Sequence, residues 1–528
     1  MSYRIILTWC FFLTIVGGMA SAQNGWYNLE ELGADITGEK LSTQIIEQAI
    51  LTASEKGGGT IYFPAGEYLT GPIVLKSNIT LHLDAGALVK FSTNFDHYLP
   101  FVQSRWEGTV MMNFSPLIYA HSQENIAITG RGKLDGQGRD WWLEMFRIRE
   151  VLKNEPDSKH KYHDMWGELN DDVITEEYYQ NTMKLRFFRP PMIQFFECNN
   201  IRIEDVTVVN SPFWTINPAF SDNITIRGVT INNPPSPNTD GINPTSCRNV
   251  RISDCHISVG DDCITIKSGR DIDGRKWNVP TENVTITNCT MLNGHGGVVI
   301  GSEVSGSVRK VTISNCVFDG TDRGIRLKSA RGRGGVVEEI RVDNIVMKNI
   351  KREAIVFNLH YDPNVPEEPV SERTPTFRNI HISNVTSTNV KNACLFIGIN
   401  EMPIENLTFN NINIQAETGF VINQAKNIEL HNVEVSVKKG ASFIAEDVSG
   451  LVLDNVKSSN PLEDAPTIDL LNVKDVFIYN CFPMVSTQQF LKVDGKETKN
   501  VHLQNNLFYN VRTPVVKGAE LNRKAVVL

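Results

Sequence analysis

A short phrase of alternating apolar residues recurs along most of this chain. It has the form Asn-Ile/Val-x-Ile/Leu-x-Asn/Asp-Val/Cys, and its clearest copies begin at Asn200, Asn223, Asn249, Asn283, Asn379, Asn406, Asn427 and Asn500. Looser copies begin at Lys310, Glu339, Gly450 and Asp475, and weaker ones at Asn78 and Asn125. An internal repeat of this kind strongly constrains the fold, because each copy must bury its apolar face against its neighbours.

Each copy alternates apolar and variable positions, which is the period of a β-strand. Ile, Val and Thr dominate the apolar positions, as in strands, and Asn and Gly supply the turns. Several neighbouring copies are 21 to 27 residues apart. This spacing is too short for an ordinary strand-helix-strand crossover. We therefore predict an all-β chain folded as a single parallel β-helix, with coils about 4.8 Å apart and the Asn residues stacked as a ladder.

The open ends of such a solenoid need a cap. Residues 42–56 predict an N-terminal capping helix, because Ile45, Ile46, Ala49, Ile50 and Ala53 share one face. Ser42 or Thr43 can begin this helix, and the glycines at 57–59 end it. Residues 139–186 lack the phrase and are rich in Trp, Tyr and charge, which predicts a loop insertion near the cleft.

The N-terminus predicts a cleavable signal peptide over residues 1–22. Arg4 precedes the apolar run Ile5–Gly18, and Ala20-Ser21-Ala22 fits a signal peptidase site. A membrane anchor is the alternative, but the run is shorter than the roughly 20 residues of a spanning helix. We expect the mature domain, 23–528, to be secreted or periplasmic, monomeric and without a membrane span.

Four of the nine cysteines, Cys255, Cys289, Cys316 and Cys481, end copies of the phrase. Valine stands at the same place in other copies, so this position belongs to the core and we predict free buried thiols rather than disulfides. No spacing indicates metal ligands, and no metal or cofactor is expected. The net charge of −9 argues against nucleic acid as a partner and requires a local basic patch for any polyanion.

Four stretches after consecutive phrases align as one strand in successive coils: Gly241–Ser246, Cys263–Ser268, Gly297–Ser302 and Gly324–Ser329. This alignment stacks Asp240 on Asp262 and Asp261 on His295. Two carboxylates can cleave a glycosidic bond as acid and base, and adjacent carboxylates force one of them to retain a proton. We expect that proton on Asp261, with Asp240 and Asp262 holding a water between them in inverting geometry.

Cations converge on the same surface. Arg326 and Lys328 are two residues apart and share a face two coils further on, and Lys267 lies in the column of Lys328. The alternative is that these aspartates have only a structural role, because Asp and Gly are common turn residues before strands.

Four ordered motifs raise the case for catalysis, and they resemble those of the polygalacturonase family of glycoside hydrolases (family 28). The motifs are Asn238-Thr239-Asp240-Gly241, Gly260-Asp261-Asp262, Gly294-His295-Gly296 and Arg326-Leu327-Lys328. Further similarity includes Arg105-Trp106-Glu107-Gly108 and Gly130–Gly136. The resemblance implies a right-handed β-helix and an inverting hydrolase of pectic galacturonan that uses no metal.

Carried over by motif, Asp261 is the general acid, Asp240 and Asp262 position the water, and His295 tunes the acid. Arg326 and Lys328 bind a substrate carboxylate beside the scissile bond, where the fork of Arg suits a carboxylate.

Further substrate-binding candidates are Asn238, Lys267, Tyr361, Arg105 and Glu107. Lys267 is either a uronate contact or a solvated lysine, and Arg331 and Arg333 are assigned to a solvated loop. The insertion favours exo action, because it can close one end of a cleft. The alternatives are a rhamnogalacturonan or xylogalacturonan hydrolase, a Ca²⁺-dependent pectate lyase, and a non-catalytic glycan-binding β-helix.

Overall fold

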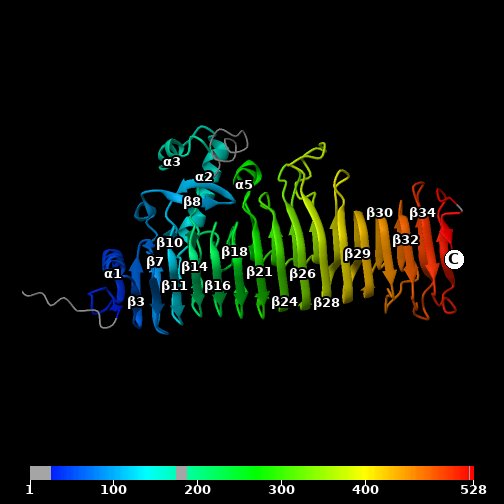
Figure 1. Cartoon of the computed structure of the whole chain (residues 1–528), viewed down its shortest axis with the longest axis horizontal. Coiled ribbons are helices and arrows are strands. Elements are labelled where there is room, and N and C mark those ends of the chain that lie inside the picture. Colours follow the sequence, from blue (N-terminus) through cyan, green and yellow to red (C-terminus); the bar gives the residue numbers. More distant parts are fainter. Residues whose placement is uncertain (1–24, 174–186, 523, 528) are drawn as a thin grey trace, which may run out of the picture.

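The computed structural model describes residues 25–173, 187–522 and 524–527. The predicted signal peptide therefore lies outside the described residues. Within them, parallel strands stack in one long row from the N-terminal to the C-terminal end of the molecule (Figure 1). The chain is a right-handed parallel β-helix, as predicted. No helix in the described part of the chain is long and apolar enough to cross a membrane.

The repeated phrase forms the first face of the β-helix. Its strands are β1 (Trp26–Asn28), β3 (Gly59–Phe63), β6 (Ile79–Leu83), β11 (Glu124–Gly130), β14 (Asn199–Glu204), β16 (Asp222–Arg227), β18 (Arg248–Ser253), β21 (Thr281–Thr287), β24 (Val308–Asp319), β26 (Val336–Lys348), β28 (Thr376–Ile397), β29 (Ile404–Val437), β30 (Phe443–Asp454), β32 (Lys474–Tyr479), β34 (Lys499–Gln504) and β36 (Val526–Val527). Ile201 pairs with Ile224, Ile224 with Val250, and Val250 with Val284, so equivalent residues stack in register.

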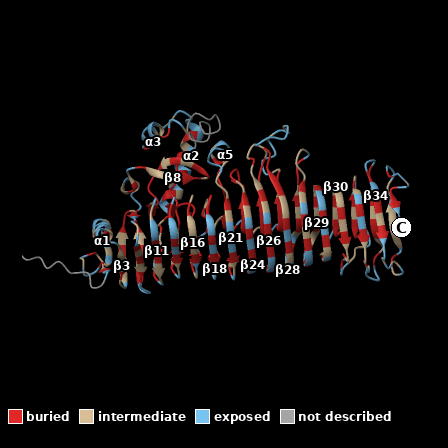
Figure 2. Ribbon diagram, in the orientation of Figure 1, coloured by how far each residue is buried: buried red, intermediate tan, exposed pale blue. Residues whose placement is uncertain are grey.

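A second face begins with short strands and merges into the long strands β24, β26 and β28. Its short members are β2 (Thr37–Leu41), β4 (Gly66–Thr70), β7 (Ala87–Phe91), β12 (Lys133–Asp135), β15 (Thr207–Val209), β17 (Thr230–Asn232), β19 (His256–Ser258) and β22 (Thr290–Leu292). Buried and exposed positions alternate along the strands (Figure 2). The inward side chains form one continuous apolar core.

The third face carries the predicted catalytic strands. It comprises β5 (Ile73–Val74), β10 (Ile118–His121), β13 (Ile193–Phe196), β20 (Asp262–Ile266), β23 (Gly296–Gly301), β25 (Ile325–Lys328), β27 (Glu353–Asn358), β31 (Ile468–Leu471), β33 (Gln489–Asp494) and β35 (Thr513–Lys517), with parts of β28, β29 and β30 between them.

The asparagine ladder is confirmed. The amide of Asn200 donates to Asn125 at 2.6 Å and that of Asn223 to Asn200 at 3.2 Å. Each of these residues has a φ between 53° and 55°, the left-handed region that Asn tolerates better than other non-glycine residues. Asn therefore serves two purposes at this turn, since it permits the backbone angle and bonds the coil before it.

The phrase-ending cysteines are buried and free, as predicted. Cys255, Cys289 and Cys316 are 2%, 2% and 1% exposed, and Val229 fills the equivalent position of another coil with no exposure. The predicted N-terminal cap is also present as α1 (Thr43–Glu55), which buries Ile46, Ala49, Ile50 and Ala53. Ser42 is its N-cap residue, although its side chain makes no capping bond and interacts with Asp35 instead.

The insertion after residue 138 is not the loop that the sequence predicted. Its described part holds α2 (Arg139–Asn154) and α3 (His163–Leu169), and residues 174–186 lie outside the described residues. Both helices stand over the N-terminal half of the stack (Figure 1). Their large aromatic residues, read as loop composition, are buried instead, for example Trp141 at 0% and Trp166 at 4% exposed.

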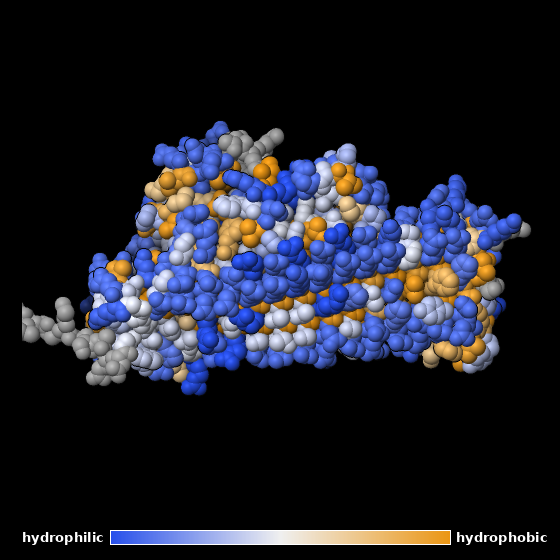
Figure 3. All heavy atoms as spheres, viewed as in Figure 1, coloured by the Kyte–Doolittle hydropathy of each residue, from blue (hydrophilic) through white to orange (hydrophobic). Residues whose placement is uncertain are grey.

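An antiparallel hairpin lies beside these helices, formed by β8 (Val102–Trp106) and β9 (Thr109–Asn113). Asn170, next to α3, bonds both backbone groups of Met112 in β9, at 2.7 and 3.0 Å. The insertion therefore supports the hairpin. A short helix that the sequence did not predict, α5 (Asp271–Trp277), follows β20, and a single 3₁₀ turn, η1 (Phe95–Tyr98), follows β7. Polar side chains cover most of the face in Figure 3.

Candidate active site

The predicted register of the four catalytic stretches is confirmed. Ile242 bridges to Ile264, Ile264 pairs with Val298, and Val298 pairs with Ile325. The backbone N–H of His295 donates to the carbonyl of Asp261 at 2.8 Å, which confirms that these two residues stack. The stacked coils therefore bring side chains together that are up to 88 residues apart in the sequence, from Asp240 to Lys328.

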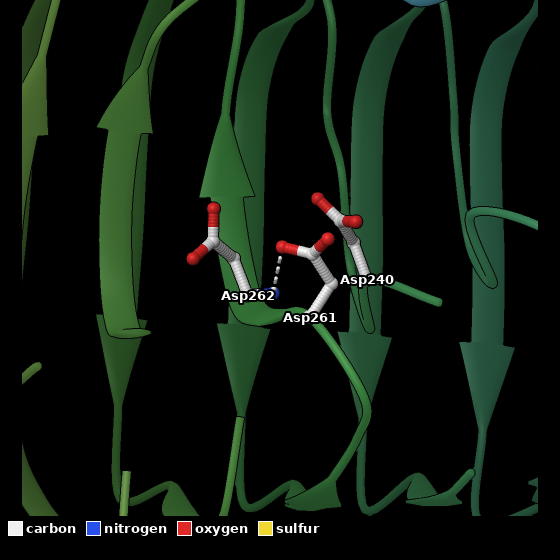
Figure 4. A group of neighbouring side chains, drawn as sticks. All are labelled: Asp240, Asp261 and Asp262. Atoms are coloured by element: carbon white, nitrogen blue, oxygen red, sulfur yellow. Dashed lines mark hydrogen bonds between the residues drawn. The ribbon is translucent and has the colours of Figure 1, made fainter. Parts of the chain in front are cut away.

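Three aspartates form the centre of the site (Figure 4). Asp240, Asp261 and Asp262 each offer one carboxylate oxygen, and these oxygens lie within 4.8 Å of one another. The backbone N–H of Asp262 donates to Oδ1 of Asp261 at 2.9 Å. The side chains of Asp240 and Asp262 are 4% and 1% exposed, whereas that of Asp261 is 19% exposed. Asp261 is therefore the carboxylate most open to a ligand.

Two cations from β25 reach Asp262. Nζ of Lys328 lies 2.8 Å from Oδ2 and Nη1 of Arg326 lies 3.5 Å from Oδ1. The strand between them, β23, makes room for this contact, because a Cβ on Gly296 would lie 2.4 Å from Val299 and 3.2 Å from Asp262. Burial alone would raise the pKa of Asp262, but Lys328 and Arg326 outweigh it and hold that pKa below its usual value.

A second buried ion pair adjoins Asp240. Nζ of Lys267 donates to Oε2 of Glu303 at 2.8 Å, lies 3.9 Å from Oδ2 of Asp240, and sits 4.4 Å from the centroid of the Trp214 ring. Burial opposes both charges, but each compensates the other, so the pKa of Glu303 is lowered and that of Lys267 is raised. The solvated-lysine alternative for Lys267 is therefore wrong, since this residue is 4% exposed.

Burial raises the pKa of Asp240 well above its usual value, and the nearby charge of Asp261 adds to this effect. The sequence assigned the retained proton to Asp261 on packing grounds alone and missed how deeply Asp240 is buried. Carboxylates this close titrate as a unit. Burial favours a retained proton at Asp240, whereas Lys328 and Arg326 favour the ionised form of Asp262.

His295 and Asn238 lie at the edge of the cluster. Nδ1 of His295 is 3.2 Å from Oδ1 of Asp261, and this hydrogen bond raises the pKa of His295. Oδ1 of Asn238 accepts a bond from Arg189 at 2.8 Å. Arg189 also donates to the backbone carbonyl of Pro237 at 2.7 Å, so it holds the turn that leads into Asp240.

The three aspartates, the cations beside them, His295 and Asn238 all line one cavity of about 610 Å³. Tyr361 is 42% exposed at one end, with its ring centroid 5.5 Å from both Arg326 and Lys328. Glu107, at the turn of the β8–β9 hairpin, lies at the other end and pairs with Arg270 at 3.1 Å. The predicted Tyr361 and Glu107 therefore both line the site.

One group of acidic side chains in the described ranges has the spacing of a metal site, and it is the same three aspartates. The ammonium groups of Lys328 and Lys267 already lie 2.8 and 3.9 Å from its carboxylate oxygens. These two lysines therefore supply positive charge at the place where a bound cation would supply it.

Comparisons with known proteins agree with this geometry. The sequence model described as glycosyl hydrolases family 28 matches residues 178–419, and one described as rhamnogalacturonase A/epimerase, pectate lyase-like, matches residues 26–131. A probable polygalacturonase of Vitis vinifera is 31% identical over 398 residues, which cover 73% of this chain and 74% of that protein. The chain belongs to glycosyl hydrolase family 28.

Two further relatives bear on how a family 28 chain acts. An exopolygalacturonase of Thermotoga maritima has a similar structure, with a TM-score of 0.69 and 34% identity over 79% of this chain and 92% of that one. An endo-polygalacturonase of Pectobacterium carotovorum is 29% identical over 395 residues, which cover 73% of this chain and 87% of that protein. Membership of family 28 makes this chain a glycoside hydrolase.

Arg105 is the predicted substrate residue that the structure keeps out of this family 28 site. It is 1% exposed, donates to Ser246 at 2.7 Å and to the carbonyl of Gly108 at 3.2 Å, and packs 4.2 Å from the Phe220 ring centroid. Arg105 therefore anchors the hairpin to the β-helix, and its neighbour Glu107 is the residue that faces the cavity.

The solvated-loop assignment of Arg331 and Arg333 is also wrong. Arg331 forms a bidentate pair with Glu401, and Arg333 pairs with Asp271 at 3.2 Å and lines the cavity. Their acidic partners come from distant segments, which no sequence spacing indicated.

Several residues that line the cavity were not predicted from the sequence: Trp214, Arg270, Glu303, Asp322, Arg323 and Arg352. The coil register could have found Asp322 and Arg352, because they continue the column of Asp261 and His295. It could also have found Trp214 and Arg323, because they stand in the column of Asp240 and Asp262. Arg270 and Glu303 follow their strands, where register does not apply.

Proposed function

We propose that this chain hydrolyses the α-1,4 bonds between galacturonate residues of pectin and removes sugars from one end of the polymer. One observation carries this proposal: the buried cations Arg326 and Lys328 stand directly beside three clustered carboxylates. The carboxylates supply the chemistry of glycoside hydrolysis, and the cations match a sugar that carries its own carboxylate. A neutral sugar would offer these cations no carboxylate beyond that of Asp262.

Asp261 is the proposed general acid, because it is the most exposed carboxylate of the three and contacts His295. It gives its proton to the glycosidic oxygen as the bond to the anomeric carbon breaks. A water then bonds to that carbon and passes its proton to Asp262. The lowered pKa of Asp262 supports its role as the base. Buried Asp240 holds the water through the carboxylate oxygen that does not face Lys267.

Inversion at the anomeric carbon is the proposed stereochemistry. Inverting pairs are typically about 6.5–9.5 Å apart, and the nearest oxygens of this cluster are within 4.8 Å. The expected gap for a water between the carboxylates is thus narrow, and the proposal rests on the motifs of the family rather than on this distance. NMR of the first product tests it, and a product that forms with retained configuration would overturn it.

Exo action is supported by the hairpin rather than directly by the insertion. Glu107 and its partner Arg270 stand at the N-terminal end of the cavity, with Trp214 on the same side. The described helices of the insertion line no part of the cavity, but they support this hairpin. Of the relatives, one is named as exo-acting and one as endo-acting, at 34% and 29% identity. Analysis of the reaction products therefore distinguishes exo from endo action.

The decisive experiment is timed product analysis on de-esterified polygalacturonate with a chelator present, with Asp261→Asn as the inactive control. Saturated monomer from the start supports a metal-independent exo-hydrolase, and mixed oligomers at early times would indicate endo action. Unsaturated products lost on chelation would indicate a pectate lyase, and binding without turnover would indicate a glycan-binding protein.

A branched substrate is the second arm of the same experiment. The match of residues 26–131 to a rhamnogalacturonase-type model is the observation that favours this alternative, although it covers the N-terminal coils and not the aspartates. Turnover of rhamnogalacturonan or xylogalacturonan, and none of polygalacturonate, would change the substrate and keep the mechanism.

We also propose that the mature chain is secreted or periplasmic and works as a monomer. N-terminal sequencing of the exported protein and light scattering test these two points, and an uncleaved leader or a stable dimer would contradict them.

A further inference from the structure

The lining of the cavity holds seven lysine and arginine side chains, and their pairing is unequal. Six have a carboxylate partner: Lys267 with Glu303, Arg270 with Glu107, Arg323 with Glu353, Arg326 and Lys328 with Asp262, and Arg333 with Asp271. The seventh, Arg352, has no acidic partner within 4 Å in the described parts of the chain. It is also exposed, so its guanidinium is free to meet a ligand.

The position of Arg352 follows from the backbone ladder of the third face. The N–H of His295 donates to Asp261, that of Asp322 to Gly294, and that of Arg352 to Asp322, each at 2.8 Å. Arg352 therefore lies three coils from Asp261, or about 14 Å at strand spacing. It also lies one coil beyond Arg326, on the side of the cavity away from the β8–β9 hairpin.

Arg352 does not stand alone at that end. Arg323 precedes β25 in the coil of Arg326 and follows Asp322, whose carbonyl accepts the N–H of Arg352. Burial lowers the pKa of Arg323, with further contributions from the charges of Arg326 and Arg352. Like charges gathered this closely oppose one another, and among the described residues Glu353 is the carboxylate that pairs with Arg323, at 2.9 Å. An arriving anion would relieve that repulsion.

We propose that Arg352, assisted by Arg323, binds the carboxylate of a second uronate, one sugar beyond the uronate held by Arg326 and Lys328. This inference rests on the proposed function and deepens it. The polymer then runs from the hairpin towards the C-terminal coils, with its terminal sugar at the aspartates and two successive carboxylates on two successive coils. A disaccharide occupies only the first of these cationic positions, and a trisaccharide occupies both.

The test compares di- and trigalacturonate as substrates of the mature protein. In Arg352→Ala we expect kcat/KM on the trimer to fall about tenfold, as for the loss of one charge-assisted hydrogen bond, mainly through KM. On the dimer, kcat/KM should stay within about twofold. Arg352→Lys should recover part of the loss on the trimer.

Lys348→Ala is the matched control, because it removes one positive charge from the exposed face of β26 away from the cavity. It should change neither substrate. An equal loss on dimer and trimer in Arg352→Ala, or no loss on either, would overturn the inference, provided that the circular dichroism of the variant matches that of the parent. If the unmodified protein hydrolyses neither oligomer, the proposed function itself fails.

Discussion

Replacing Lys328 with Met is the sharpest test of how the site keeps a base ionised near its acid. Lys328 and Asp262 are 9% and 1% exposed in their side chains and 2.8 Å apart. Removing one partner of a buried pair costs about 3–5 kcal/mol. Arg326 still lies 3.5 Å from the carboxylate, so we expect the lower end, about 3 kcal/mol.

That energy disfavours the ionised form of Asp262, relative to the protonated form, by roughly a hundredfold at any pH. The pKa of Asp262 is lowered in the folded protein, so its contribution is present at neutral pH and lost as the pH falls. In Lys328→Met the acid limb of the kcat profile on polygalacturonate should therefore move to higher pH.

The assay is kcat against pH at saturating substrate, which separates this effect from weaker substrate binding. Lys426→Met, on an exposed position of β29, controls for the loss of a charge elsewhere. An unchanged acid limb with only KM raised would refute the reasoning, because Lys328 would then serve the substrate and not Asp262.

Three further predictions use other features of the fold. The hydrogen bond to Asp261 raises the pKa of His295, so its charged form is lost only as the pH rises, and His295→Ala should remove the alkaline limb of the kcat profile and lower kcat by about 10²-fold. Gly301→Ala should be destabilised by at least about 1–3 kcal/mol in denaturant unfolding, because φ is 102° and a Cβ would lie 2.0 Å from the carbonyl oxygen of Lys328. Cys255→Val should cost less than about 1.5 kcal/mol by the same measurement, since valine fills this column in another coil, and it should leave the thiol-independent activity unchanged.

The fold was predictable because its information is local and repeated. Every copy of the phrase predicts the same strand, the same turn and the same buried positions. An ambiguous copy can therefore be interpreted from the others. The register then placed Asp240 above Asp262 and Asp261 above His295 without any knowledge of side-chain positions. Register is a property of backbone pairing, which the alternation of apolar residues determines.

What the sequence did not predict depends on segments that leave the strands. Arg105 was read as a subsite residue together with Glu107, because both belong to the segment Arg105-Trp106-Glu107-Gly108 that carries the family resemblance. Only the hairpin geometry turns one side chain into the β-helix and the other into the cavity. Glu303, the partner of Lys267, follows a strand and belongs to no repeated phrase. The helices α2 and α3 were missed because aromatic and charged composition was taken as loop character.

The two ends of the stack are finished differently. Helix α1 covers the first coils, whereas the final described coils, up to β36, end in strands and turns without a helix. Coils in a solenoid are held by their immediate neighbours, so fraying starts at the less protected terminus and proceeds one layer at a time. The aspartates lie in the interior of the chain, many coils from that terminus. The last described coils can therefore open in turn while the catalytic layers remain closed.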